Sequence, residues 1–108
     1  MTPISPLDAD TAARLVPLVA IGCSSGATVI GLSAVRRTKK LAYVLLDDQV
    51  AQGTQRELAQ LSRFGTQILQ LPSMATVAQA FGRTDVKVVG IKRGALAQGI
   101  AAKLAAQE

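Results

Sequence analysis

Residues 41–46 read LAYVLL and are apolar at every position, and this run constrains the fold more than any other part of the chain. A strand with one wet face alternates apolar and polar side chains, whereas a continuous apolar run is typical of a strand covered on both faces. Helices must therefore pack on both sides of the sheet that contains residues 41–46.

The segments around this strand alternate between helical and extended patterns. Strands are predicted at residues 27–30, 41–46, 66–71 and 86–91. Helices are predicted at residues 12–23, 32–37, 54–64, 74–81 and 95–102. This alternation predicts an α/β fold in which a sheet of about four strands lies between layers of helices. The whole chain, residues 1–108, is predicted to be one domain with residues 1–6 as a tail.

Polar residues at the starts of the predicted helices support these boundaries. Asp8 or Asp10 can cap the first helix, because a carboxylate accepts from the free backbone N–H groups of a first turn. Thr54 and Glu57 form a capping box at the third helix. Ser73 is predicted to cap the fourth helix.

The charged and reactive side chains exclude several functions. The formal net charge is +5, which favours a polyanionic partner. Cys23 is the lone cysteine and histidine is absent, which excludes an internal disulfide, a Cys–His nucleophile pair and a zinc site of the usual ligand count. No apolar run reaches the roughly 20 residues of a membrane span.

One segment, LVPLVAIGC at residues 15–23, has the outline of a bacterial lipoprotein cleavage box. A signal of that kind needs a positively charged start and an unbroken apolar core. Asp8 and Asp10 precede the segment, and Pro17 interrupts it. The sequence therefore predicts a cytoplasmic protein.

Asp47 and Asp48 follow the apolar strand, at the kind of sheet edge where α/β proteins bind ligands. A magnesium site there would need a further carboxylate at the end of a neighbouring strand, but the next strands end in Gln70–Leu71 and Ile91–Lys92. The glycine-rich residues 22–26 lack the Lys of a phosphate-binding P-loop. We therefore expect the two carboxylates to be a solvated strand end that caps the next loop, and we expect no metal, no cofactor and no enzymatic activity.

Cations gather between residues 36 and 40, where Arg36, Arg37, Lys39 and Lys40 can line one edge of the molecule. Such a run is as often a merely solvated face as a binding surface. Further cations are Arg83, Lys87 and the pair Lys92–Arg93, and strand order decides whether they adjoin the first group. If they do, the patch suits the phosphate backbone of a nucleic acid.

Aromatic side chains are expected to be buried. Leu58, Leu61 and Phe64 follow a helical spacing and are predicted to point inward, as are Tyr43 and Phe81. Without an exposed ring, a nucleic acid would be bound by backbone, shape and polar contacts rather than by base stacking.

Three stretches together resemble a known family. They are SAVRRTKKLAYVLLDD at residues 33–48, GTQREL at residues 53–58 and QLPSMATVAQAFGR at residues 70–83. Over residues 26–104 the chain resembles the kink-turn RNA-binding superfamily of ribosomal proteins L-seven-Ae and L-thirty-e, and its bacterial YlxQ-like branch most closely. The resemblance implies a three-layer α/β/α sandwich with a small mixed sheet. It also implies that RNA meets the loop that opens the second helix and the loop before the last strand.

The chain departs from the family at the residues that read a kink-turn. Aligned on Ala34–Val35, the apolar Val29 and Ile30 occupy the positions of the family's polar pair, and Ser33 replaces a Lys. Aligned instead on Gly31, Leu32 and Ser33 take the positions of the pair. Apolar side chains cannot accept a hydrogen bond from guanine, so mainly phosphate affinity would remain. Specific kink-turn recognition is therefore not expected.

Two functions from different classes remain open. The first is a non-catalytic RNA-binding or ribosome-associated module of bacterial translation. Its predicted contacts are Gly31, Ser33, Arg36, Arg37, Lys39, Lys40, Arg83 and Lys87. The alternative is a protein–protein interaction module on the same fold that has lost RNA binding, with a partner at residues 29–32 if those apolar side chains are exposed.

Overall fold

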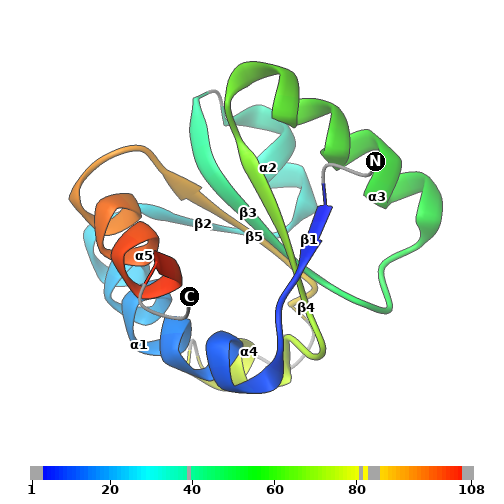
Figure 1. The fold of residues 1–108 in the computed structure, drawn as a ribbon. Coiled ribbons are helices and arrows are strands. Elements are labelled where there is room, and N and C mark those ends of the chain that lie inside the picture. Colours follow the sequence, from blue (N-terminus) through cyan, green and yellow to red (C-terminus); the bar gives the residue numbers. More distant parts are fainter. Residues whose placement is uncertain (1–3, 39, 81, 83–85, 106–108) are drawn as a thin grey trace.

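In the computed structural model, which describes residues 4–38, 40–80, 82 and 86–105, a mixed sheet lies between two layers of helices (Figure 1). The strands are β1 (Ile4–Pro6), β2 (Thr28–Ile30), β3 (Leu41–Asp47), β4 (Gln67–Leu71) and β5 (Val88–Lys92), in the spatial order β1-β4-β3-β5-β2. The helices are α1 (Ala9–Ser25), α2 (Leu32–Arg37), α3 (Gln52–Ala59), the 3-10 segment η1 (Gln60–Phe64), α4 (Ala75–Ala80) and α5 (Ala95–Ala105). The predicted α/β/α sandwich with a mixed sheet is confirmed.

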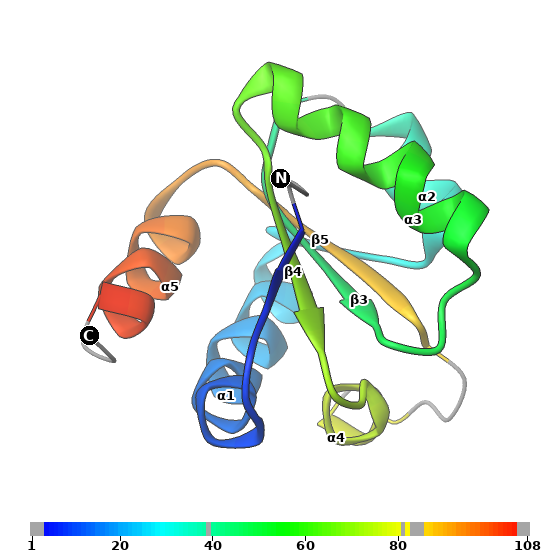
Figure 2. The same ribbon diagram turned by 45° about the vertical axis from the view of Figure 1, so that its right-hand side comes forward.

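The two helix layers build two separate cores. Figure 2 shows α2 and α3 on one side of the sheet and α1, α4 and α5 on the other. Alternate side chains of β3 serve both layers: Tyr43 and Leu45 pack in the core with α1, α4 and α5, while Val44 and Leu46 pack in the core with α2 and α3. This two-sided burial is what the continuous apolar run predicted.

At the start of β3, the pairing with β5 shifts register between Leu41 and Tyr43, so that β3 has one extra residue, Ala42, relative to β5. The extra residue reverses the alternation, so Leu41 packs on the side of α2 rather than on the side of Tyr43. Gly90 of β5 completes the fit, because a Cβ there would lie 3.1 Å from Leu41 and 3.2 Å from Val35 of α2. The absence of a side chain at position 90 lets α2 approach the sheet.

One predicted segment is wrong. Residues 4–6, expected to belong to a tail, form β1 and pair in parallel with β4, with Ile4 opposite Ile68. The sheet therefore has a fifth strand that the sequence pattern did not show. The segment is too short to display an alternation, and Pro6 reads as a strand breaker although an edge strand tolerates proline.

The predicted helix caps are confirmed in part. The Asp8 carboxylate accepts from the backbone N–H of Thr11 at 2.7 Å, and this bond lowers the pKa of Asp8. The Ser73 hydroxyl oxygen accepts from the N–H of Ala75, the first residue of α4. The capping box at Thr54 is wrong, because α3 already begins at Gln52. Within the part of the chain that the structure describes, no helix is long and apolar enough to cross a membrane.

Candidate nucleic-acid interface

Helix α2 divides the predicted RNA-binding residues between opposite ends of the sheet. At its start, the N–H of Gly31 donates to the carbonyl of Val88 at 2.9 Å, which joins the loop before α2 to the segment before β5. Gly31, Ser33 and Lys87 therefore lie at the end of the sheet where β3 finishes. Arg36, Arg37 and Lys40 lie at the other end, where β3 begins. Lys39 and Arg83 belong to the same prediction but lie outside the described residues.

The first end holds an open cleft of about 490 Å³, which we call the loop cleft. Its lining includes Ile30, Gly31, Leu32, Val50, Val86 and Lys87. The two loops that the family resemblance assigned to RNA do meet here. The lining is mainly apolar, and Lys87 is its charged side chain among the described residues.

The apolar residues at this end do not form an exposed patch. Val29, Ile30 and Leu32 are half-buried and pack against the two cores. The protein-interaction alternative depended on these side chains being exposed. Their packing shows that they are mainly part of the fold, so this alternative gains no support from them.

Asp47 is a buried structural carboxylate rather than the solvated group that we expected. Its Oδ1 accepts from the N–H of Gln49 at 2.7 Å and its Oδ2 accepts from the N–H of Met74 at 2.9 Å. Burial opposes ionisation, but these two bonds, with the Lys87 ammonium 3.9 Å away, outweigh it and lower the pKa of Asp47. The Asp47 carboxylate thus caps two loops as expected, while the solvated position expected of both carboxylates is found only at the exposed Asp48. Among the described residues, no group of three or more acidic or cysteine side chains could hold a metal ion.

The sheet order decides which cations lie together. Strand β5 pairs antiparallel with β3, so Lys92 lies opposite Leu41 and Arg93 follows at the same end of the sheet. Both side chains are exposed. They join the exposed cations of α2 and Lys40, which directly precedes β3, and we call the set the basic end: Arg36, Arg37, Lys40, Lys92 and Arg93. Lys87 directly precedes the same strand, at the opposite end of the sheet, and does not belong to the basic end.

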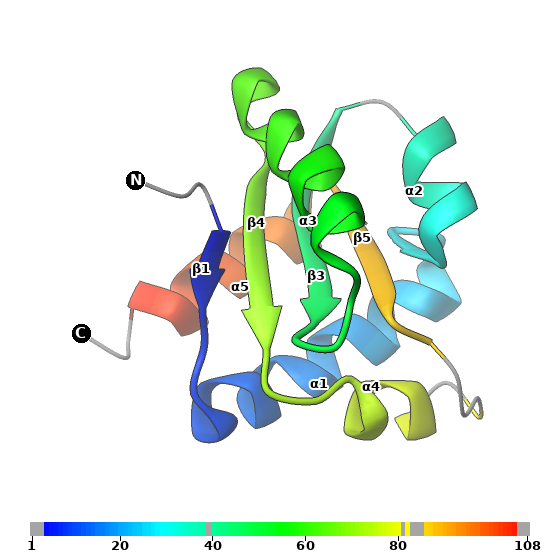
Figure 3. The same cartoon turned by 90° about the vertical axis from the view of Figure 1, so that its right-hand side faces the viewer.

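A groove of about 570 Å³ crosses the basic end. We call it the basic groove; it is lined by Arg36, Thr38, Lys40, Leu41, Leu61, Phe64, Thr66 and Arg93. Phe64 was predicted to point inward, but it is 70% exposed. Leu61 and Phe64 share a face of η1, and Leu61 packs against the core. Phe64 lies three residues before β4 begins, and Figure 3 shows that the helical segment projects beyond the end of that strand. Among the described residues, no strand therefore lies beneath the Phe64 ring. Of the other aromatic residues, Tyr43 is buried as expected and Phe81 lies outside the described residues.

Two guanidinium groups are fixed at this groove. Arg36 donates to both carboxylate oxygens of Glu57, at 2.6 and 2.8 Å. This bidentate bond raises the pKa of Arg36 and lowers the pKa of Glu57. Arg93 donates from Nη2 to the backbone carbonyl of Phe64 at 2.7 Å. A Cβ at position 65 would lie 3.1 Å from this guanidinium, so Gly65 leaves the space that the contact needs.

Among the described residues, negative charge lies mainly at the other end of the sheet, apart from Glu57, which is paired with Arg36. Asp47 and Asp48 lie there, at the end of β3. Asp8 and Asp10 lie at the start of α1. This start is at the same end of the sheet, because the N–H of the preceding Leu7 donates to the carbonyl of Gln70 near the end of β4. Along the strand direction the molecule is therefore polarised, with the basic end opposite these carboxylates. This separation favours contact between an anionic partner and the basic end.

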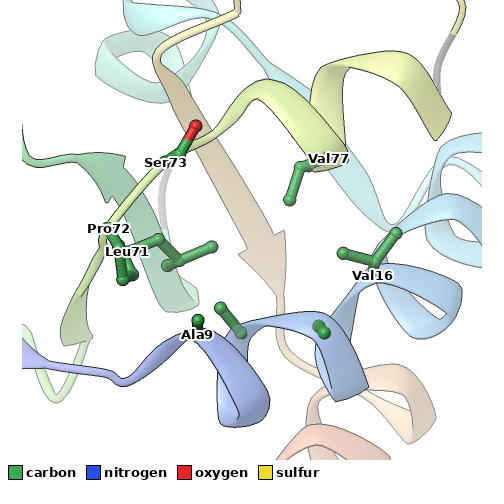
Figure 4. Close-up of a pocket in the computed structure, with 8 residues that line it drawn as sticks. Ala9, Val16, Leu71, Pro72, Ser73 and Val77 are labelled. Carbon is green, nitrogen blue, oxygen red and sulfur yellow. The ribbon is translucent and has the colours of Figure 1, made fainter.

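A further small pocket of about 110 Å³ lies between α1 and the segment before α4 (Figure 4). Ala9, Val16, Leu71, Pro72 and Val77 contribute carbon atoms, and the hydroxyl of Ser73 is the side-chain oxygen that Figure 4 draws. A lining of this kind offers no proton donor or acceptor of suitable pKa for acid–base chemistry.

The fold is shared with known structures. A protein of unknown function from Bacillus halodurans matches with a TM-score of 0.71 and 16% identity, over 86% of this chain and 98% of that one. A 15.5 kD RNA-binding protein from Giardia lamblia matches with a TM-score of 0.67 and 20% identity, over 91% of this chain and 87% of that one. No protein-family model and no curated protein sequence matches the chain. The structural likeness supports the fold that the family resemblance implied.

Proposed function

We propose that this chain is a non-catalytic RNA-binding module that holds structured RNA mainly through phosphate contacts at the basic end. The observation that carries the proposal is the convergence of exposed cations from α2, from the start of β3 at Lys40 and from the end of β5 on one end of the sheet. Guanidinium and ammonium groups bind phosphate oxygens without reading the base sequence. The fold shared with an RNA-binding protein from Giardia lamblia agrees with this function.

The same geometry argues for backbone contacts over kink-turn recognition. Near the loop cleft, the side chains of Val29 and Ile30 pack against the cores, and being apolar they cannot accept hydrogen bonds from base edges. The basic end supplies charge from side chains that reach solvent. We therefore assign affinity to the basic end and leave Gly31, Ser33 and Lys87 a secondary part.

The proposal extends to the setting of the protein. A module with these properties fits a YlxQ-like bacterial protein that acts on ribosomal or other structured RNA during translation in the cytoplasm. The function needs no catalytic group, in agreement with an Asp47 carboxylate whose two oxygens are both engaged in loop caps.

The test is a titration of the protein into a labelled kink-turn RNA and an unkinked duplex of equal length, at two salt concentrations. We expect similar affinity for both RNAs, falling steeply with salt, because three to five phosphate contacts give a log–log slope of roughly −2 to −4. Strong preference for the kink-turn would overturn the assignment to the basic end. Absence of binding to either RNA at low salt would overturn RNA binding itself.

A matched pair of triple variants locates the surface. Arg37→Gln, Lys40→Gln and Lys92→Gln remove three cations of the basic end. The control variant removes three exposed cations that lie outside the basic end: Arg14→Gln, Arg56→Gln and Lys103→Gln. Both variants change the net charge equally, so a larger loss of affinity in the first supports the basic end, whereas equal losses would show that only overall charge matters.

A further inference from the structure

We propose that the basic groove binds a single-stranded segment of RNA, with one unpaired base stacked on the ring of Phe64. This inference rests on the proposed RNA binding and adds to it the kind of RNA and the residue that holds a base. Phe64 is 70% exposed at the groove, although it is the type of side chain that folding normally buries. Phe64 shares the groove with apolar side chains of Leu41 and Leu61 and with three cations, and this combination indicates a ligand that joins a flat ring to negative charge.

The backbone that carries the ring is held in a fixed place. The backbone of Phe64 is anchored by the 2.7 Å bond from Arg93 to its carbonyl oxygen, and Gly65, at a φ of 84°, turns the chain directly afterwards. Leu61 of the same segment packs against the core. Because this backbone is ordered before binding, less conformational freedom is lost when a base stacks on the ring.

Cations share the groove with the ring. Arg36, Lys40 and Arg93 line the same groove as Phe64. Arg36 is already oriented by Glu57, and Arg93 by the carbonyl of Phe64. Proteins that bind single strands combine this pair of features, an aromatic platform for the base and a positively charged track for the phosphates.

Lys40 adds a strained backbone to the same place. Its φ of 61° lies in the left-handed region, which a residue with a Cβ adopts rarely and at a cost. This conformation occurs next to the register shift at the start of β3 and at the wall of the groove. Glycine would be relaxed there, so the ammonium group of Lys40 is placed at the groove at a cost in backbone strain.

Single-stranded RNA fits the groove better than a duplex does. The bases of a duplex are stacked on one another and cannot present a face to Phe64, whereas unpaired bases stack on aromatic side chains. The groove volume of about 570 Å³ is within the usual range for pockets that hold a small ligand, and it would accommodate one nucleotide and its phosphates.

The experiment uses the full chain and an unstructured RNA of about 12 adenosine and cytidine nucleotides, with a duplex of the same length as the second probe. Phe64→Ala is compared with Ile21→Ala, because Ile21 is an exposed apolar residue of α1 that lies outside the groove. We expect Phe64→Ala to weaken single-strand binding about 5- to 100-fold with no change in salt slope. Duplex binding, and both affinities of Ile21→Ala, should stay as in the wild type.

Phe64→Trp provides a direct readout, since the chain contains no tryptophan. We expect this variant to retain single-strand affinity and its fluorescence to be quenched as the RNA saturates it. An unchanged affinity in Phe64→Ala, or an unquenched tryptophan at saturation, would overturn the stacking contact.

The outcomes separate this inference from the proposed function. If the single strand and the duplex bind alike and Phe64→Ala has no effect, RNA binding stands and the stacked base is refuted. If neither RNA binds at low salt, both fail together. Quenching of Phe64→Trp by an acidic peptide but not by RNA would refute the inference and assign the groove to a protein partner.

Discussion

Replacement of Asp47 by Asn should destabilise the fold far more than the same change at the adjacent Asp48. The Asp47 side chain is buried, with the residue only 3% exposed, and it ties the end of β3 to two loops. One oxygen accepts from the N–H of Gln49 and the other from the N–H of Met74. Asp48 is exposed and belongs to the same turn, which makes it the matched control.

The expected loss of unfolding free energy follows from these two hydrogen bonds, which are 2.7 and 2.9 Å long. A hydrogen bond to a charged group contributes about 1.5–3 kcal/mol, and a buried donor that loses its partner incurs a desolvation cost of similar size. An amide has one oxygen, so the side chain of the Asp47→Asn variant can satisfy one backbone N–H while its own NH₂ faces the other. We expect the free energy of unfolding to fall by about 2–4 kcal/mol. For a domain of this size that lowers Tm by about 10–20 °C.

The assay is urea and thermal unfolding of Asp47→Asn, Asp48→Asn and the wild type at neutral pH, followed by circular dichroism. If Asp47→Asn unfolds within about 0.5 kcal/mol of Asp48→Asn, the two loop caps do not stabilise the fold and the reasoning is refuted. Added Mg²⁺ should stabilise none of the three proteins. A Mg²⁺ effect that is lost in Asp47→Asn would instead reveal a metal site.

Three further predictions concern the titration of Asp47, the packing at Gly22 and the backbone of Lys40. The pKa of Asp47 is lowered in the folded state, so the ionised carboxylate stabilises the fold above its unfolded pKa of about 3.9. This contribution is lost as the pH falls through the folded pKa. The free energy of unfolding should therefore fall less steeply with acid in Asp47→Asn than in the wild type. Gly22→Ala should lower the free energy of unfolding by about 1–3 kcal/mol, because a Cβ there would collide with Thr28. The control Gly53→Ala lies in open space within α3 and should be neutral or stabilising by up to about 1 kcal/mol. Equal effects of the two changes in urea unfolding would refute the close packing of α1 on β2. Lys40→Gly should raise stability by up to about 1 kcal/mol by relieving its positive φ while it weakens RNA binding, and a loss of stability would show that the conformation is not strained.

Local sequence patterns predicted the helices and the long strands well. The run at residues 41–46 is buried on both faces as its composition required, and the segment LSAVRR forms α2 with the predicted bounds. Capping was predictable where the signal is local, as at Asp8. It failed at Thr54 and Glu57, because Glu57 forms its ion pair with Arg36 on another helix and α3 starts earlier.

The candidate site was only half predictable from the sequence. The cations between residues 36 and 40 were visible as a cluster, and an anionic partner followed from the net charge. The part played by Arg93 was not visible, because it depends on β5 lying antiparallel beside β3. The exposure of Phe64 was missed because its helical spacing predicts a shared face with Leu61 but not where the sheet beneath that face ends.

The sequence by itself therefore determined what is local: hydrophobic period, helix starts, and the amount and sign of charge. The tertiary structure alone decided which ends of which strands meet, and so separated Lys87 from the basic end and brought Arg93 to it. The physical reason is that periodicity records which face of an element is buried, whereas strand order depends on contacts between residues far apart in the chain. An interface built at the end of a sheet is made almost entirely of such contacts.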